Sequence, residues 1–189
     1  MRNNILAHAS EFSQLHNIEY YRFEEDFVEA NMRCIPMIVR FKMDLARIKL
    51  KLSQWSKFTA KERIELAVMT CEDDHEINAY ALHLQTLVLS RTGEIVSILP
   101  EENAAWKNRD LVPDAVQEHL YGTGFHLTTN HWRSLTNLQR FALIKLSREG
   151  HENKNLRKAA LEFGIPPSVQ SIQHTEYSLT YAGRKNSTR

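Results

Sequence analysis

The chain has 189 residues, of which 42% are hydrophobic and 25% are charged, and its formal net charge is +1. These values are typical of one soluble globular domain with some length left for tails. A near-neutral chain has no overall attraction for nucleic acid or anionic lipid. No stretch approaches the roughly 20 apolar residues of a membrane helix. The polar first residues do not form a secretory signal, so we expect a cytoplasmic protein.

We expect three regions along the chain: a flexible N-terminal arm over residues 1–19, a helical domain over 20–165, and a disordered or loosely structured tail over 166–189. The first long helix of the domain is predicted from Pro36 to Arg47. Pro36 suits the first helical position, where its missing N–H costs nothing, and the apolar residues that follow form one stripe.

The middle of the chain carries two further helix signals. Thr59 and Glu62 form a capping box, which predicts a helix start. Asp73 or Asp74 is the expected N-cap of the clearest helix, which ends at Gly93. The apolar run from Ile95 to Leu99 is either a strand or an extended connector.

In the C-terminal part, residues 101–111 are predicted to be a loop anchored by Trp106. A short helix should begin near Pro113 and end at Gly122, and a capping box at Thr136 opens the next helix. A final helix is expected near Asn153 to Phe163. The pattern predicts an all-α, compact, bundle-like domain of six or seven helices, with no internal repeat at a fixed period.

The best metal-ligand candidates are Cys71 and His75, which lie four residues apart, together with His83 two turns further on. A closed zinc site needs about four ligands, and no second Cys/His pair has suitable spacing. We therefore predict no bound metal and no cofactor. Cys34 sits beside Arg33 at a helix start, where a thiol pKa can fall, but a packed small thiol is the favoured interpretation.

No sequence pattern indicates catalysis. The chain contains no GxSxG, P-loop, GxGxxG or HExxH motif. His119, His126 and His131 are scattered in a polar stretch, where histidines are usually surface residues. We predict that the protein is not an enzyme.

Residues 156–177 favour one alternative function, a helix-turn-helix regulator that binds DNA. A helix, a glycine turn at Gly164 and a Ser-capped second helix all fit this stretch. The would-be recognition helix from Ser168 to Tyr177 has no Arg or Lys for phosphates or guanine, so nucleic acid is not the favoured partner.

Two dense segments resemble the nitrate reductase-associated protein family. The first contains FEEDF (23–27), RCIPM (33–37), VRFKMD (39–44), IKL (48–50) and Trp55. The second contains Trp132, LQRFAL (138–143), KLSR (145–148), HEN (151–153) and EFG (162–164). The chain departs from the family pattern at Ala46-Arg47, where the family has a small residue and glycine.

The resemblance implies a non-catalytic accessory or maturation factor for a molybdenum-cofactor nitrate reductase, which acts by protein–protein binding. Its expected partner is the reductase polypeptide or the machinery that loads the molybdenum cofactor. Polar residues beside aromatic ones in the two segments are the candidate contacts. Arg33, Arg40 and Asp44 either pair internally or face a partner. The full candidate set is Arg33, Arg40, Asp44, Trp55, Trp132, Arg140, His151, Glu152 and Asn153.

Overall fold

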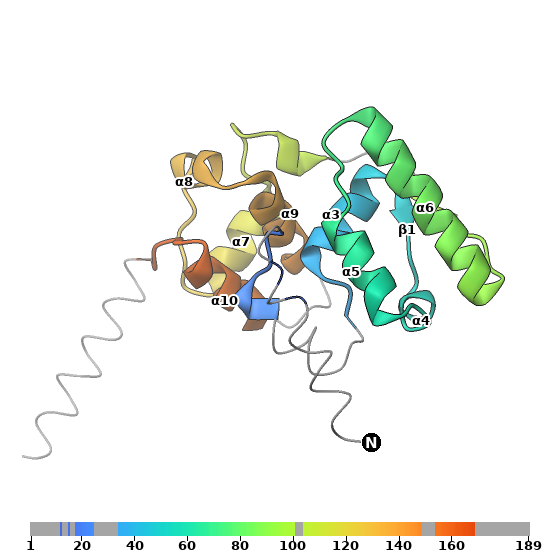
Figure 1. Ribbon diagram of the computed structural model, residues 1–189. Coiled ribbons are helices and arrows are strands. Elements are labelled where there is room, and N and C mark those ends of the chain that lie inside the picture. The colour runs from blue at the N-terminus through green and yellow to red at the C-terminus, as the bar shows by residue number, and fades with distance from the viewer. Residues whose placement is uncertain are drawn as a thin grey trace, which may run out of the picture. The chain divides into compact units, whose positions relative to one another are not determined.

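The structure is a computed structural model that describes residues 12, 15, 18–24, 34–100, 104–148 and 154–168. The described part is mostly helical and includes one short two-stranded sheet, which confirms the predicted all-α class (Figure 1). The chain forms two compact units, Met1–Ala104 and Ala105–Arg189, each described separately below. The expected boundaries at residues 19/20 and 165/166 stay predictions.

The first unit is built from helices α3 (Met37–Leu45), α4 (Leu52–Trp55), α5 (Ala60–Val68) and α6 (Asp74–Thr92). Strand β1 (Ile48–Lys49) pairs antiparallel with β2 (Ser97–Ile98), Ile48 opposite Ile98. The extended segment expected near residues 95–99 is therefore a strand. Helix α3 packs against both α5 and α6.

Local signals fix the helix starts in this unit. Thr59 accepts a hydrogen bond from the Glu62 backbone N–H, and the Glu62 carboxylate accepts one from the Thr59 N–H at 2.7 Å. Asp73 caps α6 through the Glu76 N–H at 2.8 Å, and Gly93 ends it in the left-handed conformation. The predicted capping box and both ends of the long helix are confirmed.

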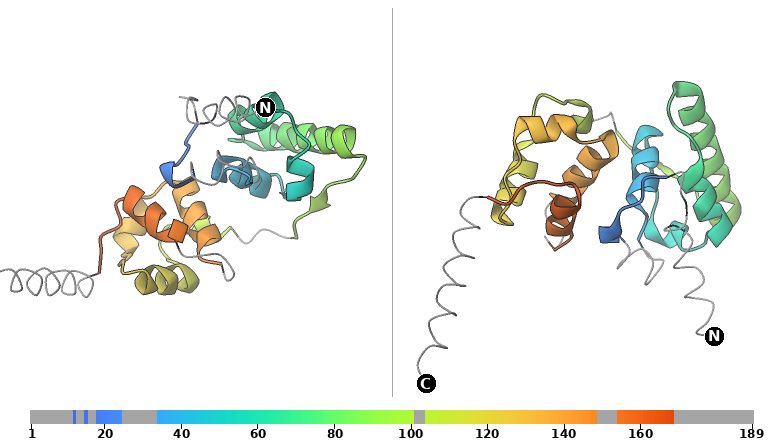
Figure 2. Two further views of the ribbon diagram at one scale, coloured as in Figure 1. Left: turned by 90° about the horizontal axis from the view of Figure 1, so that it is seen from below. Right: turned by 60° about the vertical axis from the view of Figure 1, so that its left-hand side comes forward.

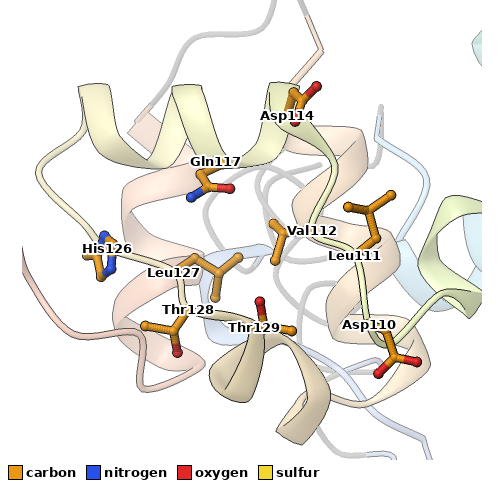
Figure 3. Close-up of a pocket in the computed structure, with 9 residues that line it drawn as sticks. All are labelled: Asp110, Leu111, Val112, Asp114, Gln117, His126, Leu127, Thr128 and Thr129. Atoms are coloured by element: carbon orange, nitrogen blue, oxygen red, sulfur yellow. The ribbon is translucent and has the colours of Figure 1, made fainter.

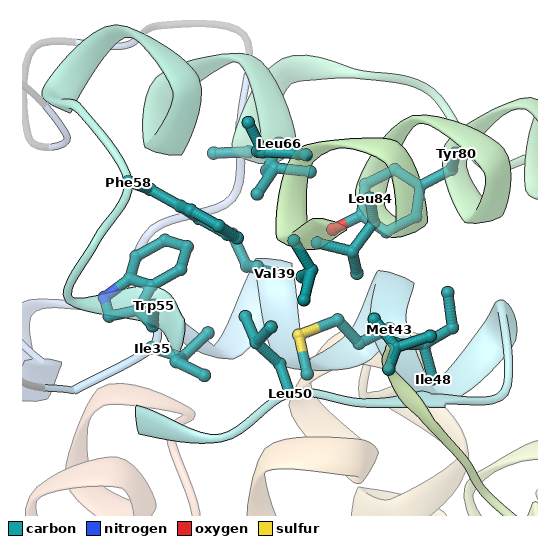
Figure 4. Packing of buried hydrophobic residues seen from close by; sticks show 14 of the residues in the cluster. Ile35, Val39, Met43, Ile48, Leu50, Trp55, Phe58, Leu66, Tyr80 and Leu84 are labelled. Atoms are coloured by element: carbon teal, nitrogen blue, oxygen red, sulfur yellow. The ribbon is translucent and has the colours of Figure 1, made fainter. Parts of the chain in front are cut away.

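The core of the first unit lies between α3, α5 and α6. Figure 4 shows Val39 and Met43 of α3 facing Leu66 of α5 and Tyr80 and Leu84 of α6. Ring and aliphatic side chains from the segment between α3 and α5 complete the cluster: Ile48, Leu50, Trp55 and Phe58. Burial of this apolar surface is the main stabilising contribution to the unit.

The second unit contains the 3₁₀ turn η1 (Ala105–Lys107) and helices α7 (Asp114–Gly122), α8 (Thr129–Ser134), α9 (Asn137–Leu146) and α10 (Lys154–Glu162). Helix α9 contacts α7, α10 and η1, and α7 also contacts α10 (Figure 2). The capping box at Thr136 is confirmed, because its side chain accepts from the Gln139 N–H at 3.1 Å. The short helix α8 replaces the polar loop expected there, because six residues are too few to show a helical period.

The two units repeat one series of elements at a constant offset of 77 positions, as between Trp55 and Trp132. Helices α3 and α7 have equal length, and each follows a proline N-cap. A residue with positive φ then follows each helix, Arg47 at 56° and Gly124 at 86°. The next residue pairs with a later segment in both units: Ile48 with Ile98, and Phe125 with Pro167.

The correspondence continues through the next two helices. Lys51 and Thr128 are the N-caps of α4 and α8, and Thr59 and Thr136 are those of α5 and α9. We call residues 35–69 the first repeat and residues 112–146 the second repeat. Identical residues occupy these paired positions: Pro36/Pro113, Val39/Val116, Leu50/Leu127, Trp55/Trp132, Thr59/Thr136, Arg63/Arg140 and Leu66/Leu143.

This duplication corrects the expectation of no internal repeat. Most paired positions share only their burial or their role in a helix cap. Such similarity does not appear as sequence identity, so the repeat is not visible in the sequence alone. After residue 69 the constant offset is lost, since α6 has 19 residues and α10 has nine.

Candidate functional site

The candidate contact residues of the first unit differ in exposure. Arg40 and Asp44 are half-buried on α3, and the Arg40 side chain donates to the Ile35 carbonyl at 3.0 Å. Trp55 is 1% exposed and lies inside the core. Arg40 and Asp44 are therefore partly accessible to solvent, whereas Trp55 has almost no exposed surface.

The candidates of the second unit, Trp132 and Arg140, are brought together in the interior. Arg140 is 2% exposed, and it donates to the Trp106 carbonyl at 2.7 Å and to the Leu135 carbonyl. Its guanidinium lies 5.9 Å from the Trp132 ring centre, a cation–π contact. The Trp132 indole N–H donates to the Asn108 carbonyl at 2.7 Å. In this structure both residues hold the unit together.

Burial changes the electrostatics of Arg140. Loss of hydration lowers the pKa of its guanidinium, and the nearby Arg109 charge lowers it further. The acceptors that stabilise the cation are backbone carbonyls and the Asn137 side chain at 2.5 Å. Sequence reasoning did not anticipate this role, because Trp106 is 34 residues away from Arg140.

Arg63 plays the same part in the first repeat, and sequence reasoning missed it. Its guanidinium donates twice to the Trp55 carbonyl, at 3.0 and 3.3 Å, and lies 5.2 Å from the Trp55 ring centre. Arg63 and Arg140 each follow their tryptophan by eight residues and come directly after a capping box. The spacing was the available signal, and it becomes meaningful only when the two repeats are compared.

The remaining candidates cannot be placed. Arg33, His151, Glu152 and Asn153 lie outside the described residues, so their contact roles stay predictions.

The metal candidates do not come together. His75 is exposed at the start of α6, while His83 lies 3.9 Å from the Glu65 carboxylate and Cys71 is half-buried. Within the described part of the chain, no group of three or more His, Cys, Asp or Glu residues is placed to hold a metal ion.

Cys71 instead lies in an unfavourable environment for a thiolate. Burial raises its pKa to about 11, although the neighbouring Lys42 ammonium offsets part of the shift. Lys42 is itself buried and donates to the Ala67 carbonyl at 2.5 Å. Cys34, the other thiol, is free and half-buried.

A pocket of about 370 Å³ opens on the second unit (Figure 3). It lies between α7 and the segment that leads into α8. Its base is apolar, because Val112 and Leu127 are buried, and its other walls are mostly polar. The lining residues are Asp110, Leu111, Val112, Asp114, Gln117, His126, Leu127, Thr128 and Thr129.

The polar groups of the pocket differ in whether they already form hydrogen bonds or ion pairs within the protein. Asp110 accepts from the Arg133 guanidinium at 2.8–2.9 Å, and Thr128 caps α8 through the His131 N–H. Asp114, in the first turn of α7, makes no hydrogen bond or ion pair with another residue that the structure describes. Figure 3 shows Gln117 and Thr129 directed toward the same space from opposite sides.

The helix-turn-helix alternative gains no support. Helix α10 ends near the expected turn, and Gly164 has a φ of 70°. Ser168, the expected cap of the second helix, is buried and its N–H donates to the Gly124 carbonyl at 2.8 Å. The rest of the would-be recognition helix lies outside the described residues.

In the part of the chain that the structure describes, no helix has the length and apolar content needed to cross a membrane.

Comparison with known proteins gives one result for the whole chain. The model of the family described as conserved nitrate reductase-associated protein matches residues 20–163. No curated protein and no solved structure matches the chain. Because the match covers most of its length and both repeats, the chain belongs to this family, as the resemblance of the two dense segments implied.

Proposed function

We propose that the protein is a non-catalytic accessory or maturation factor of a molybdenum-cofactor nitrate reductase, and that it acts in the cytoplasm by binding another protein. The observation that carries this proposal is the family match over residues 20–163. The partner is the reductase polypeptide or the machinery that loads its cofactor.

The uses of the cationic side chains support a binding role. Arg63 and Arg140 are committed to backbone carbonyls inside their units, so they are not free to act on a substrate. Arg40 and Asp44 are only half-buried on α3, although both already make contacts within the protein. We therefore propose Arg40 and Asp44 as partner contacts, while the buried Trp55, Trp132 and Arg140 maintain the surfaces around them.

Exposed apolar side chains give a second kind of support. Leu82 and Leu89 lie seven residues apart, hence on one face of α6, and they are 67% and 56% exposed. Ile95, just after the helix, is 85% exposed. Exposed apolar side chains that share one helix face can contribute to a protein–protein interface.

Gene deletion tests the proposal most directly. We expect nitrate reductase activity to fall in the deletion strain, and the amount of reductase polypeptide then separates two mechanisms. Activity lost while the polypeptide remains indicates maturation, whereas loss of both indicates stabilisation. Affinity purification from the complemented strain should recover the reductase or its cofactor-loading proteins. Normal activity after deletion, with none of these proteins recovered, would show the proposal to be wrong.

A further inference from the structure

We propose that the pocket of the second unit receives a basic side chain, Arg or Lys, carried by an extended segment of a partner polypeptide. The inference rests on the proposed function only in requiring a polypeptide partner. Its evidence is the chemistry of the pocket and the comparison of the two repeats.

The pocket has the chemistry that a long cationic side chain requires. The buried Val112 and Leu127 offer an apolar base for an aliphatic stem. Asp114 carries a carboxylate with no partner among the described residues, and Gln117 and Thr129 offer hydrogen-bond acceptors within the same space. Asp110 adds a second carboxylate, which Arg133 already neutralises in part.

The first repeat shows that the fold does not need this polar lining. At the positions equivalent to Asp114 and Thr129 it has the apolar residues Met37 and Leu52. Met37 is buried beneath other parts of the first unit, yet α3 has the same length as α7 and the same proline N-cap. Asp114 and Thr129 of the second repeat are therefore available for binding.

The first repeat also shows what this face of the fold can hold. Glu24, which precedes the repeat by more than ten residues, accepts a hydrogen bond from the Met37 N–H at 2.7 Å and is fully buried. Another segment of polypeptide thus reaches the start of α3 and places a side chain there. Asp114 is the equivalent of Met37, so the pocket lies at the equivalent place on the second unit.

Charge determines the kind of side chain. In the first repeat the corresponding positions hold the basic residues Arg40, Lys49 and Lys51, of which Arg40 donates to the Ile35 carbonyl and Lys51 pairs with Glu94. Their equivalents in the second repeat are Gln117, His126 and Thr128, and the carboxylates of Asp110 and Asp114 now belong to the face itself. Because the pocket lining carries two carboxylates and no Arg or Lys, complementarity requires a cation from the arriving segment.

The test uses the full chain and small probes that stand for the partner side chain. Capped arginine amide is titrated into the ¹⁵N-labelled protein, and backbone amide shifts are recorded. Capped citrulline amide, which has nearly the same shape without the charge, is the matched probe. We expect the arginine probe to shift amides of residues 110–129 in a saturable way, and citrulline to bind more weakly.

Two variants assign the effect to the pocket. Asp114→Asn removes the charge of this carboxylate and should weaken binding of the arginine probe by about two- to fivefold. Glu118→Gln removes one charge from the same helix at a position outside the pocket lining, and it should bind the probe as the unaltered protein does. Circular dichroism confirms that both variants are folded.

Equal binding of arginine and citrulline, no saturable shift in residues 110–129, or equal effects of the two variants would each overturn the inference. Recovery of the reductase with the Asp114→Asn variant at full yield, together with any of these results, would reject the pocket and leave the proposed function standing.

Discussion

At the scale of single residues, the two buried arginines are distinguished by the kind of acceptor that they use. Arg63 and Arg140 are cations satisfied by carbonyl oxygens, which carry only partial negative charge. A guanidinium suits this environment because it is weakly hydrated and offers five donors in a fixed plane. The tryptophan ring beside each arginine adds a cation–π contact. Among the acceptors described above, carbonyl oxygens and this ring therefore stabilise the buried cation in place of a carboxylate.

Cys71 provides a pH-dependent prediction at this scale. Its pKa of about 11, against 9.0 for an unperturbed thiol, should slow alkylation by iodoacetamide at pH 8 about a hundredfold, since the thiolate is the nucleophile. The measurement uses a Cys34→Ser variant, so that only Cys71 reacts. The alkylation rate of Cys71 should rise about tenfold per pH unit up to pH 11, and in urea it should equal the rate of an unperturbed thiol. A rate that levels off near pH 9 in the folded protein would contradict the assigned pKa.

The raised pKa of Cys71 also has a consequence for stability. Below pH 9 the thiol is neutral in both states, so ionisation contributes nothing to the free energy of unfolding. Above pH 9 only the unfolded chain loses the proton, and the free energy of unfolding should fall until pH 11, where the folded thiol ionises as well.

At the scale of elements, the threonine caps start α5 and α9 in the same way. Thr136→Ala removes the bond to the Gln139 N–H, and Thr59→Ala removes the bond to the Glu62 N–H. Each change should lower the free energy of unfolding by about 1 kcal/mol, measured by urea denaturation. Thr86→Ala is the control, since Thr86 lies within α6 and its hydroxyl only bonds back to Leu82. A cost at Thr86 as large as at the caps would argue against the capping interpretation.

The elements also show how far sequence reasoning reaches. Capping boxes, the proline before α3 and Gly93 act on neighbouring residues, so their effects could be predicted from local spacing. The family pattern of glycine before Ile48 was informative too, because Arg47 occupies that place with a φ of 56°.

What could not be predicted depends on distant parts of the chain. The burial of Arg140 requires the Trp106 carbonyl, and the pocket requires α7 to meet the segment before α8. Polar residues beside tryptophans were predicted to face a partner, but the same composition also fits a buried cation held by carbonyls. Sequence spacing does not separate these two cases, because both place arginine near an aromatic ring.

At the scale of the whole molecule, each repeat contains its own tryptophan–arginine pair, so damage to one pair should remain within its unit. Arg140→Met removes the side-chain donor to the carbonyls of Trp106 and Leu135, and should lower the free energy of unfolding by about 2–4 kcal/mol. Hydrogen exchange should accelerate for amides of residues 105–168 and stay unchanged for residues 35–98.

Arg63→Met is the matched variant, and it should reverse this pattern because its carbonyl partner, Trp55, lies in the first unit. Exchange that accelerates equally in both units for either variant would show that the chain unfolds as a single cooperative body.

The duplicated arrangement has a consequence for synthesis of the chain on the ribosome. The first unit is complete at Ala104, when residues 105–189 have yet to be added. At ~5–20 residues per second this remainder takes about 4–17 s to translate, far longer than a small helical unit needs to fold. The first unit can therefore bury Trp55 and Phe58 before Trp132 has left the ribosome. Because the first repeat leaves the ribosome first, its apolar segments can pack together before the similar segments of the second repeat are present to pair with them wrongly.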